Sequence, residues 1–158
     1  MEVALTSLSD AQKQRIFSNL AKHIEKSFGQ SPEYGEGVIT AYTLLQDGRE
    51  VLELQTDFGD HLDLLLVVDG HPYSLGGDYV HGENAWRDFD AKARHLIDVL
   101  SRDRMVQLEE WYRGKTRIGG RAHVHAEGDN GPFTLIDRTG KSFILFARTV
   151  NSDRVIWK

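Results

Sequence analysis

The sequence predicts an α+β fold in which two amphipathic helices pack on an antiparallel β-meander sheet. Residues 9–28 and 84–103 carry apolar side chains at spacings of three and four, as in helices with one buried side. The other segments are short, apolar or alternating, and turn residues such as Asp47-Gly48 separate them. The expected order is helix, meander, helix, meander, in a single domain covering residues 1–158.

Each predicted helix has its own boundary signals. Ser9 and Gln12 have the spacing of a capping box, in which the Gln12 side chain returns to the Ser9 amide. Gly29 and Pro32 are expected to end this first helix, because neither residue favours its continuation. In the second helix, Asn84 is the expected N-cap.

The strands are expected between turn signals. In the first meander they are predicted at 38–45, 51–56 and 62–68, and Asp69-Gly70 with Pro72 ends the last one. In the second meander they are predicted at 105–112, 117–127, 133–137, 142–150 and 155–157. Residues 105–112 could instead prolong the second helix, and Asn151-Ser152-Asp153 is expected to form a turn. The core is expected to contain Phe17, Ile24, Leu52, Leu64, Phe89, Leu96 and Phe143.

The composition excludes several classes of protein. The chain has no cysteine, so disulfides, thiolate zinc sites and cysteine nucleophiles are ruled out. The first ten residues lack a basic segment and a long apolar run, and no signal peptide is expected. The longest apolar run, Leu64 to Val68, is far shorter than the roughly 20 residues that span a bilayer. We therefore expect a cytoplasmic protein with no membrane contact and no cofactor.

The net charge of −5 is unevenly distributed. Residues 1–80 contain 13 acidic and 5 basic side chains, a net of −8, whereas residues 81–158 contain 11 acidic and 14 basic, a net of +3. Arg49 is the only basic residue between positions 33 and 78. Such a field repels nucleic acid and attracts basic proteins, although a solvated acidic surface is the simpler interpretation.

Four acidic residues of the first meander form the predicted partner-binding site: Glu53, Asp57, Asp60 and Asp63. Glu53 and Asp63 occupy polar positions on two adjacent predicted strands, and the other two flank the turn that joins these strands. Burying four like charges is costly, so the patch should be solvated or matched by a partner. The expected partner is a basic protein.

A second candidate site lies on the predicted strand 117–127. Arg121, His123, His125 and Glu127 alternate with small apolar residues, so they are expected to share one face. Two imidazoles and a carboxylate could bind a divalent metal ion or act as a general acid and base. The solvent face of an amphipathic strand is the simpler interpretation, so these residues are a fallback catalytic or metal site.

A basic hairpin is predicted around Arg113, Lys115, Arg117 and Arg121. Trp111 and Tyr112 lie beside it, and basic side chains next to aromatic ones suit single-stranded nucleic acid. The cluster is small in an acidic chain, so nucleic-acid binding is not expected. Its basic side chains are expected to match the acidic half, either within the chain or in another subunit.

Two functions are compatible with these patterns. The first is a small bacterial protein-binding module, such as an inhibitor, an immunity protein or a secretion chaperone, whose acidic sheet face engages a basic partner. The alternative is a small hydrolase or metal-dependent enzyme that uses Arg121, His123, His125 and Glu127. A concave pocket with converging polar groups would favour the enzyme. The sequence does not define an oligomeric state.

Overall fold

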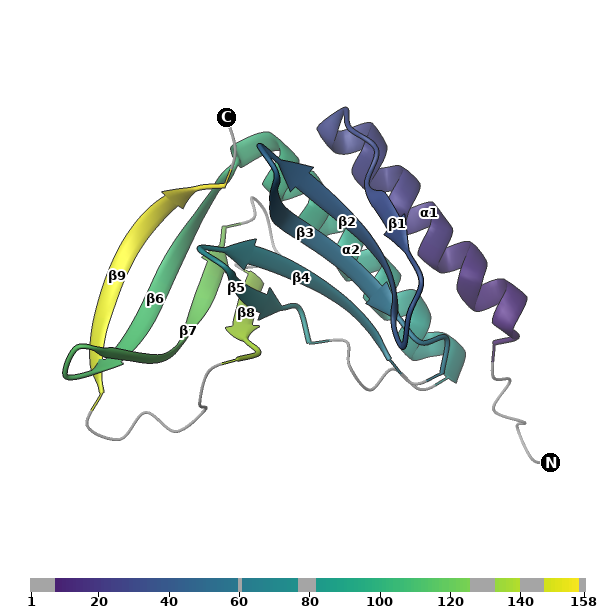
Figure 1. Cartoon of the computed structure of the whole chain (residues 1–158). Helices are drawn as coiled ribbons and strands as arrows, with labels where there is room; N and C mark the ends of the chain where they lie inside the picture. The colour runs from purple at the N-terminus through teal and green to yellow at the C-terminus, as the bar shows by residue number, and fades with distance from the viewer. Residues whose placement is uncertain (1–7, 60, 77–81, 126–132, 140–146, 157–158) are drawn as a thin grey trace.

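The chain folds as an α+β protein with helices packed on an antiparallel sheet. The structure is a computed structural model that describes residues 8–59, 61–76, 82–125, 133–139 and 147–156. The elements in that part of the chain are α1 (Asp10–Phe28), β1 (Glu33–Gly35), β2 (Thr40–Gln46), β3 (Arg49–Thr56), β4 (Leu62–Val68), β5 (His71–Ser74), α2 (Gly82–Asp103), β6 (Met105–Arg113), β7 (Thr116–Val124), β8 (Phe133–Asp137) and β9 (Arg148–Val155). The strands form one sheet in the order β1-β2-β3-β4-β5-β8-β7-β6-β9 (Figure 1). The predicted fold class is confirmed.

The two helices lie side by side and run in the same direction (Figure 1). The Lys13 ammonium lies 5.7 Å from the centre of the Trp86 ring near their N-terminal ends, and His23 Nε2 lies 2.6 Å from Asp98 Oδ1 further along. The capping box at Ser9 is present, and Gly29 ends α1 in the left-handed conformation. Both helix signals in the first segment are therefore confirmed.

One side of the sheet faces the helices and the other does not. In the pair β3–β4, Leu52 is opposite Leu66 and Leu54 is opposite Leu64, and all four are fully buried in the core under the helices. Glu53 and its neighbours at alternate positions point to the outer side. The predicted core residues Phe17, Ile24, Leu52, Leu64, Phe89 and Leu96 are buried, and Phe143 lies outside the described residues.

Two Asp-Gly pairs form hairpin turns: Asp47-Gly48, as predicted, and Asp69-Gly70, which was expected only to end a strand and instead joins β4 to β5. All four residues have positive φ: 52° at Asp47 and 76° at Gly48 in one turn, and 52° at Asp69 and 78° at Gly70 in the other. Two consecutive residues with positive φ make the tight turn whose twist matches that of the flanking strands. These turns fix the register between β2 and β3 and between β4 and β5, and the buried leucines favour the register between β3 and β4.

Several strand boundaries differ from the sequence prediction. Strand β1 was not predicted, and β5 includes Pro72, which was expected to end the meander. Strand β9 runs straight through Asn151-Ser152-Asp153, because these residues pair with Glu109, Leu108 and Gln107 of β6 instead of forming a turn. Asn84 lies inside α2, which begins at Gly82, and β7 ends at Val124. Residues 105–112 are strand and do not prolong the helix.

The sheet has two halves that meet at a narrow junction. In the described residues, β5 and β8 pair only through Tyr73 with Asp137 and Ser74 with Ile136. Strands β1–β5 form the half on one side of this junction, and strands β6, β7, β8 and β9 form the half on the other (Figure 1). Within the described part of the chain, neither helix is long and apolar enough to cross a membrane.

Candidate functional site

The outer side of the first half of the sheet carries an acidic row. Glu33 of β1 is opposite Thr43 of β2, which is opposite Glu53 of β3. Cross-strand partners share a face, so both carboxylates lie on one line across three strands. We call Glu33, Thr43 and Glu53 the acidic row.

The charge of Glu53 is not compensated. Burial raises the pKa of Glu53 above its ordinary value, and the nearby negative charge of Glu50 raises it further. Gln55 donates a hydrogen bond of 3.2 Å to Glu53 Oε1 and only partly opposes these effects. Among the described residues no cation forms an ion pair with Glu53, so its ionised form is available to an external cation.

The turn after β3 is engaged by the chain itself. Asp57 Oδ1 accepts hydrogen bonds from the backbone amides of Gly59 and His61, at 2.8 and 3.2 Å. Lys13 of α1 reaches the same turn and donates to the carbonyl oxygens of Phe58 and Gly59. The sequence suggested that Arg49 was the only base near this turn, and Lys13 corrects that view. Asp60 lies outside the described residues.

Asp63 is an interior residue. Its side chain is 1% exposed, and it accepts hydrogen bonds from Ser74 Oγ at 2.6 Å and from the Leu64 amide at 2.8 Å. Arg138, from the other half of the sheet, lies 3.3 Å from Asp63 Oδ2. The expected solvated patch of four carboxylates therefore does not include Asp63, because the fold itself supplies its partners. Glu53 and Asp57 remain at or near the surface.

A buried arginine network lies in the second half of the sheet, and sequence reasoning missed it. Arg117 donates to Glu110 at 2.7 Å, to Asp137 at 2.6 Å and to the Tyr73 hydroxyl at 2.7 Å. Burial would lower the pKa of Arg117, but hydrogen bonds to the two carboxylates raise it instead. Burial would likewise raise the pKa of Asp137, and hydrogen bonds from Arg117 and Thr139 more than offset this and hold it below the ordinary value. Here each buried charge has a partner.

Gly120 makes room for this network. A Cβ at Gly120 would lie 2.6 Å from the carbonyl oxygen of Glu109 and 3.2 Å from Arg117 Nη2. Arg117 was expected on a basic hairpin that matches the acidic half, and it is instead turned inward, with its side chain 14% exposed. Its carboxylate partners, Glu110 and Asp137, both belong to the second half of the chain, and the cation that pairs with Asp63 of the acidic half is Arg138, outside the predicted hairpin.

The histidine strand presents its polar residues on one side, as predicted for positions 121–125. Arg121, His123 and His125 alternate with the buried residues Ala122 and Val124. Arg121 lies over the Trp111 ring at 5.1 Å, and His123 Nε2 lies 3.7 Å from Glu109 Oε1.

The metal hypothesis for this strand stays a prediction. Glu127 lies outside the described residues. Within the described part of the chain, no group of three His, Asp or Glu side chains is arranged to hold a metal ion. A shallow hollow of about 190 Å³ borders His123 and His125, and Asp103 and Asp153 also line it.

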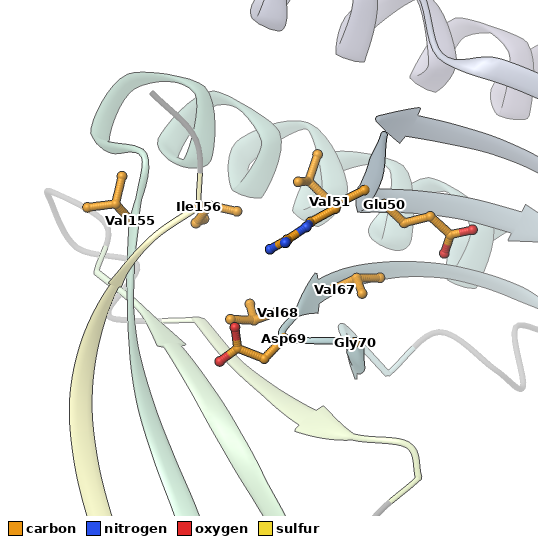
Figure 2. Close-up of a pocket in the computed structure, with 9 residues that line it drawn as sticks. Glu50, Val51, Val67, Val68, Asp69, Gly70, Val155 and Ile156 are labelled. Carbon is orange, nitrogen blue, oxygen red and sulfur yellow. The ribbon is translucent and has the colours of Figure 1, made fainter. Parts of the chain in front are cut away.

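A groove lies where the end of β9 approaches the first half of the sheet. It has a volume of about 670 Å³, and Figure 2 shows Val155 and Ile156 on one side and Val51, Val67 and Val68 on the other. Asp69 also lines this groove and pairs with Arg154 at 3.3 Å. The lining of this groove contains no histidine, so it does not supply the converging groups that the enzyme hypothesis needs.

No protein-family model, curated protein or solved structure shows significant similarity to this chain. A functional proposal must therefore depend on the chemistry of the chain's own residues.

Proposed function

We propose that this chain is a small protein-binding module that engages a basic partner through the acidic row, as an inhibitor, an immunity protein or a secretion chaperone would. The observation that supports it is the raised pKa of Glu53, which burial and Glu50 produce without a compensating cation. A lysine or arginine of a partner placed there would favour the ionised carboxylate and gain binding energy. The proposal places this encounter in the cytoplasm, as the cysteine-free sequence suggests.

The uncharged side chains in the row next to the acidic row also suit a protein contact. Ala41 and Gln55 lie opposite each other there, and no helix covers this side of β2 and β3 (Figure 1). A partner could therefore approach the carboxylates from this side of the sheet. Electrostatic steering would make its association fast and sensitive to salt, since the Debye length falls from about 10 Å at 0.1 M to about 3 Å at 1 M.

The test combines capture of a partner from the native host with association kinetics. The double variant Glu33→Lys and Glu53→Lys should slow association at low salt by about tenfold or more, while circular dichroism shows an unchanged fold. The matched control is Glu25→Lys, which changes an exposed charge on α1, and it should associate nearly as fast as the wild type. The proposal would be refuted if the captured partner associated with the double variant as fast as with the wild type, and at the same rate at low and high salt.

A further inference from the structure

A hollow on the helical side of the molecule is lined by three arginines. It lies between α1 and α2, has a volume of about 270 Å³, and includes Arg15 of α1 with Arg87 and Arg94 of α2. Asp90 is the only acidic residue in its lining, and Glu83 pairs with Arg87 at 2.8 Å beside it, so three positive charges meet two negative charges and leave a net of +1 there. This is the opposite sign to the acidic row on the other side of the sheet.

The guanidinium groups in this hollow have unused hydrogen-bond donors. Arg15 is exposed and makes no hydrogen bond or ion pair to any described residue. Arg94 donates to Asp90 through Nε alone, at 3.1 Å to each carboxylate oxygen, which leaves both of its Nη groups free among the described residues. Arg87 contacts Glu83 through Nε and Nη2, and its Nη1 has no hydrogen-bond partner among the described residues.

The three arginines bring more positive than negative charge to one small hollow, even with Asp90 and Glu83 beside them. Gln12 and Asn19 add amide donors to the same lining, and the carboxylate of Asp90 is already occupied by Arg94. The hollow therefore offers many donors and almost no free acceptor.

We propose that this hollow binds the phosphate group of a phosphate monoester. Arginine matches phosphate oxygens in geometry as well as charge, and the three terminal oxygens of a monoester can accept hydrogen bonds from several guanidinium groups at once. Leu8 and Ile16 also line the hollow and provide an apolar contact for the organic part of the ester. A phosphodiester has only two terminal oxygens and a single negative charge, so it offers fewer and weaker acceptors to these donors. This site is separate from the acidic row, and it can be present whether or not the chain binds a basic protein.

The experiment is a titration of the full chain with phenyl phosphate, followed by backbone amide NMR at constant ionic strength maintained with chloride. We expect saturable shifts at residues 12–19 and 87–94, with a Kd in the millimolar range for this exposed site. Arg15→Gln should weaken binding at least fivefold while its spectrum elsewhere keeps the native pattern. The control Arg49→Gln, which removes another exposed arginine, should bind like the wild type.

Diethyl phosphate provides the second comparison. If the site recognises a monoester, the diester should bind at least tenfold more weakly than phenyl phosphate. Equal affinity for the two compounds, equal affinity of Arg15→Gln and wild type, or no shifts at these residues would each overturn the proposal. None of these measurements uses a protein partner, so their outcome does not depend on whether the acidic row binds a basic protein.

Discussion

Glu53 in the first half of the sheet and the buried carboxylates of the second half differ in whether a cation neutralises them. In the second half, Glu110 and Asp137 are buried and share the guanidinium of Arg117, so the pKa of Asp137 is held below its ordinary value. In the first half, Glu53 is half-buried beside Glu50, and its pKa is raised. A buried carboxylate with a cation contributes to the fold, whereas one without a cation costs stability and is a candidate for binding.

The largest expected effect comes from removing the shared cation. Arg117→Met should lower the free energy of unfolding at pH 7 by about 3–5 kcal/mol, because it leaves two buried carboxylates without their partner. Urea denaturation measures this change. The control Arg121→Met removes an exposed arginine that lies over Trp111 and should cost at most about 1 kcal/mol.

The pH dependence of the same variant sharpens the comparison. In the wild type, the lowered pKa of Asp137 gives stability that is present above its ordinary value and is lost as pH falls through the folded-state value. In Arg117→Met the two carboxylates have lost their cation and protonate more readily. The difference in the free energy of unfolding between this variant and the wild type should therefore become smaller at acid pH. If this difference stays constant between pH 7 and pH 3, the loss of packing, and not the loss of charge, destabilises the variant.

A smaller effect is expected from filling the space beside the network. Gly120→Ala should lower stability by about 1–3 kcal/mol, because its Cβ would meet the Glu109 carbonyl at 2.6 Å and crowd Arg117. Gly35→Ala is the matched control in β1, where an added Cβ meets nothing within 4 Å. Thermal unfolding of both variants tests the difference, and equal melting temperatures would contradict this account of Gly120.

The smallest expected effect is a gain in stability, and it comes from a substitution in the first half of the sheet. Glu53→Gln should raise stability at pH 7 by about 0.5 kcal/mol, because it removes an uncompensated charge and keeps an acceptor for Gln55. The raised pKa of Glu53 means that the wild type regains this stability as pH falls through the folded-state value, so the gain should vanish near pH 4. Glu33→Gln, at an exposed position, should change stability little. A destabilised Glu53→Gln would show that Glu53 has a structural partner.

Local signals in the sequence were enough to predict the helices and the tight hairpin at Asp47-Gly48. The capping box at Ser9 and this Asp-Gly pair act over two to four residues, so one sequence is sufficient to find them. Strand β9 was misread because its polar centre lies on an open edge of the sheet, where Asn151 and Asp153 can face water while their backbone pairs with β6. Strand β1 has only three residues and no apolar pattern.

The candidate sites were harder to predict because they depend on contacts between distant residues. Glu53 was found from its polar position on a strand, whereas Asp63 at a similar position is matched by Arg138, 75 residues away. Arg117 sits among charged neighbours that indicated a surface hairpin, and the bond to Tyr73, 44 residues away, gives no local signal. Pairing of this kind follows from strand order, and strand order across the β5–β8 junction has no signature in the sequence.

The narrow β5–β8 junction has a consequence for how the molecule opens. In the described structure two residue pairs and a backbone hydrogen bond from Arg138 to the Pro72 carbonyl join the two halves of the sheet there. Side chains of Arg117, Arg138 and Arg154 bridge the halves to Tyr73, Asp63 and Asp69. Each half should therefore behave as a cooperative unit in hydrogen exchange, with sub-global opening along this line. High salt weakens the exposed Arg154–Asp69 pair more than the enclosed Arg117 contacts. Amides of β5 and β8 should then exchange faster in 1 M salt than those of β3 and β6, which are paired along their whole length.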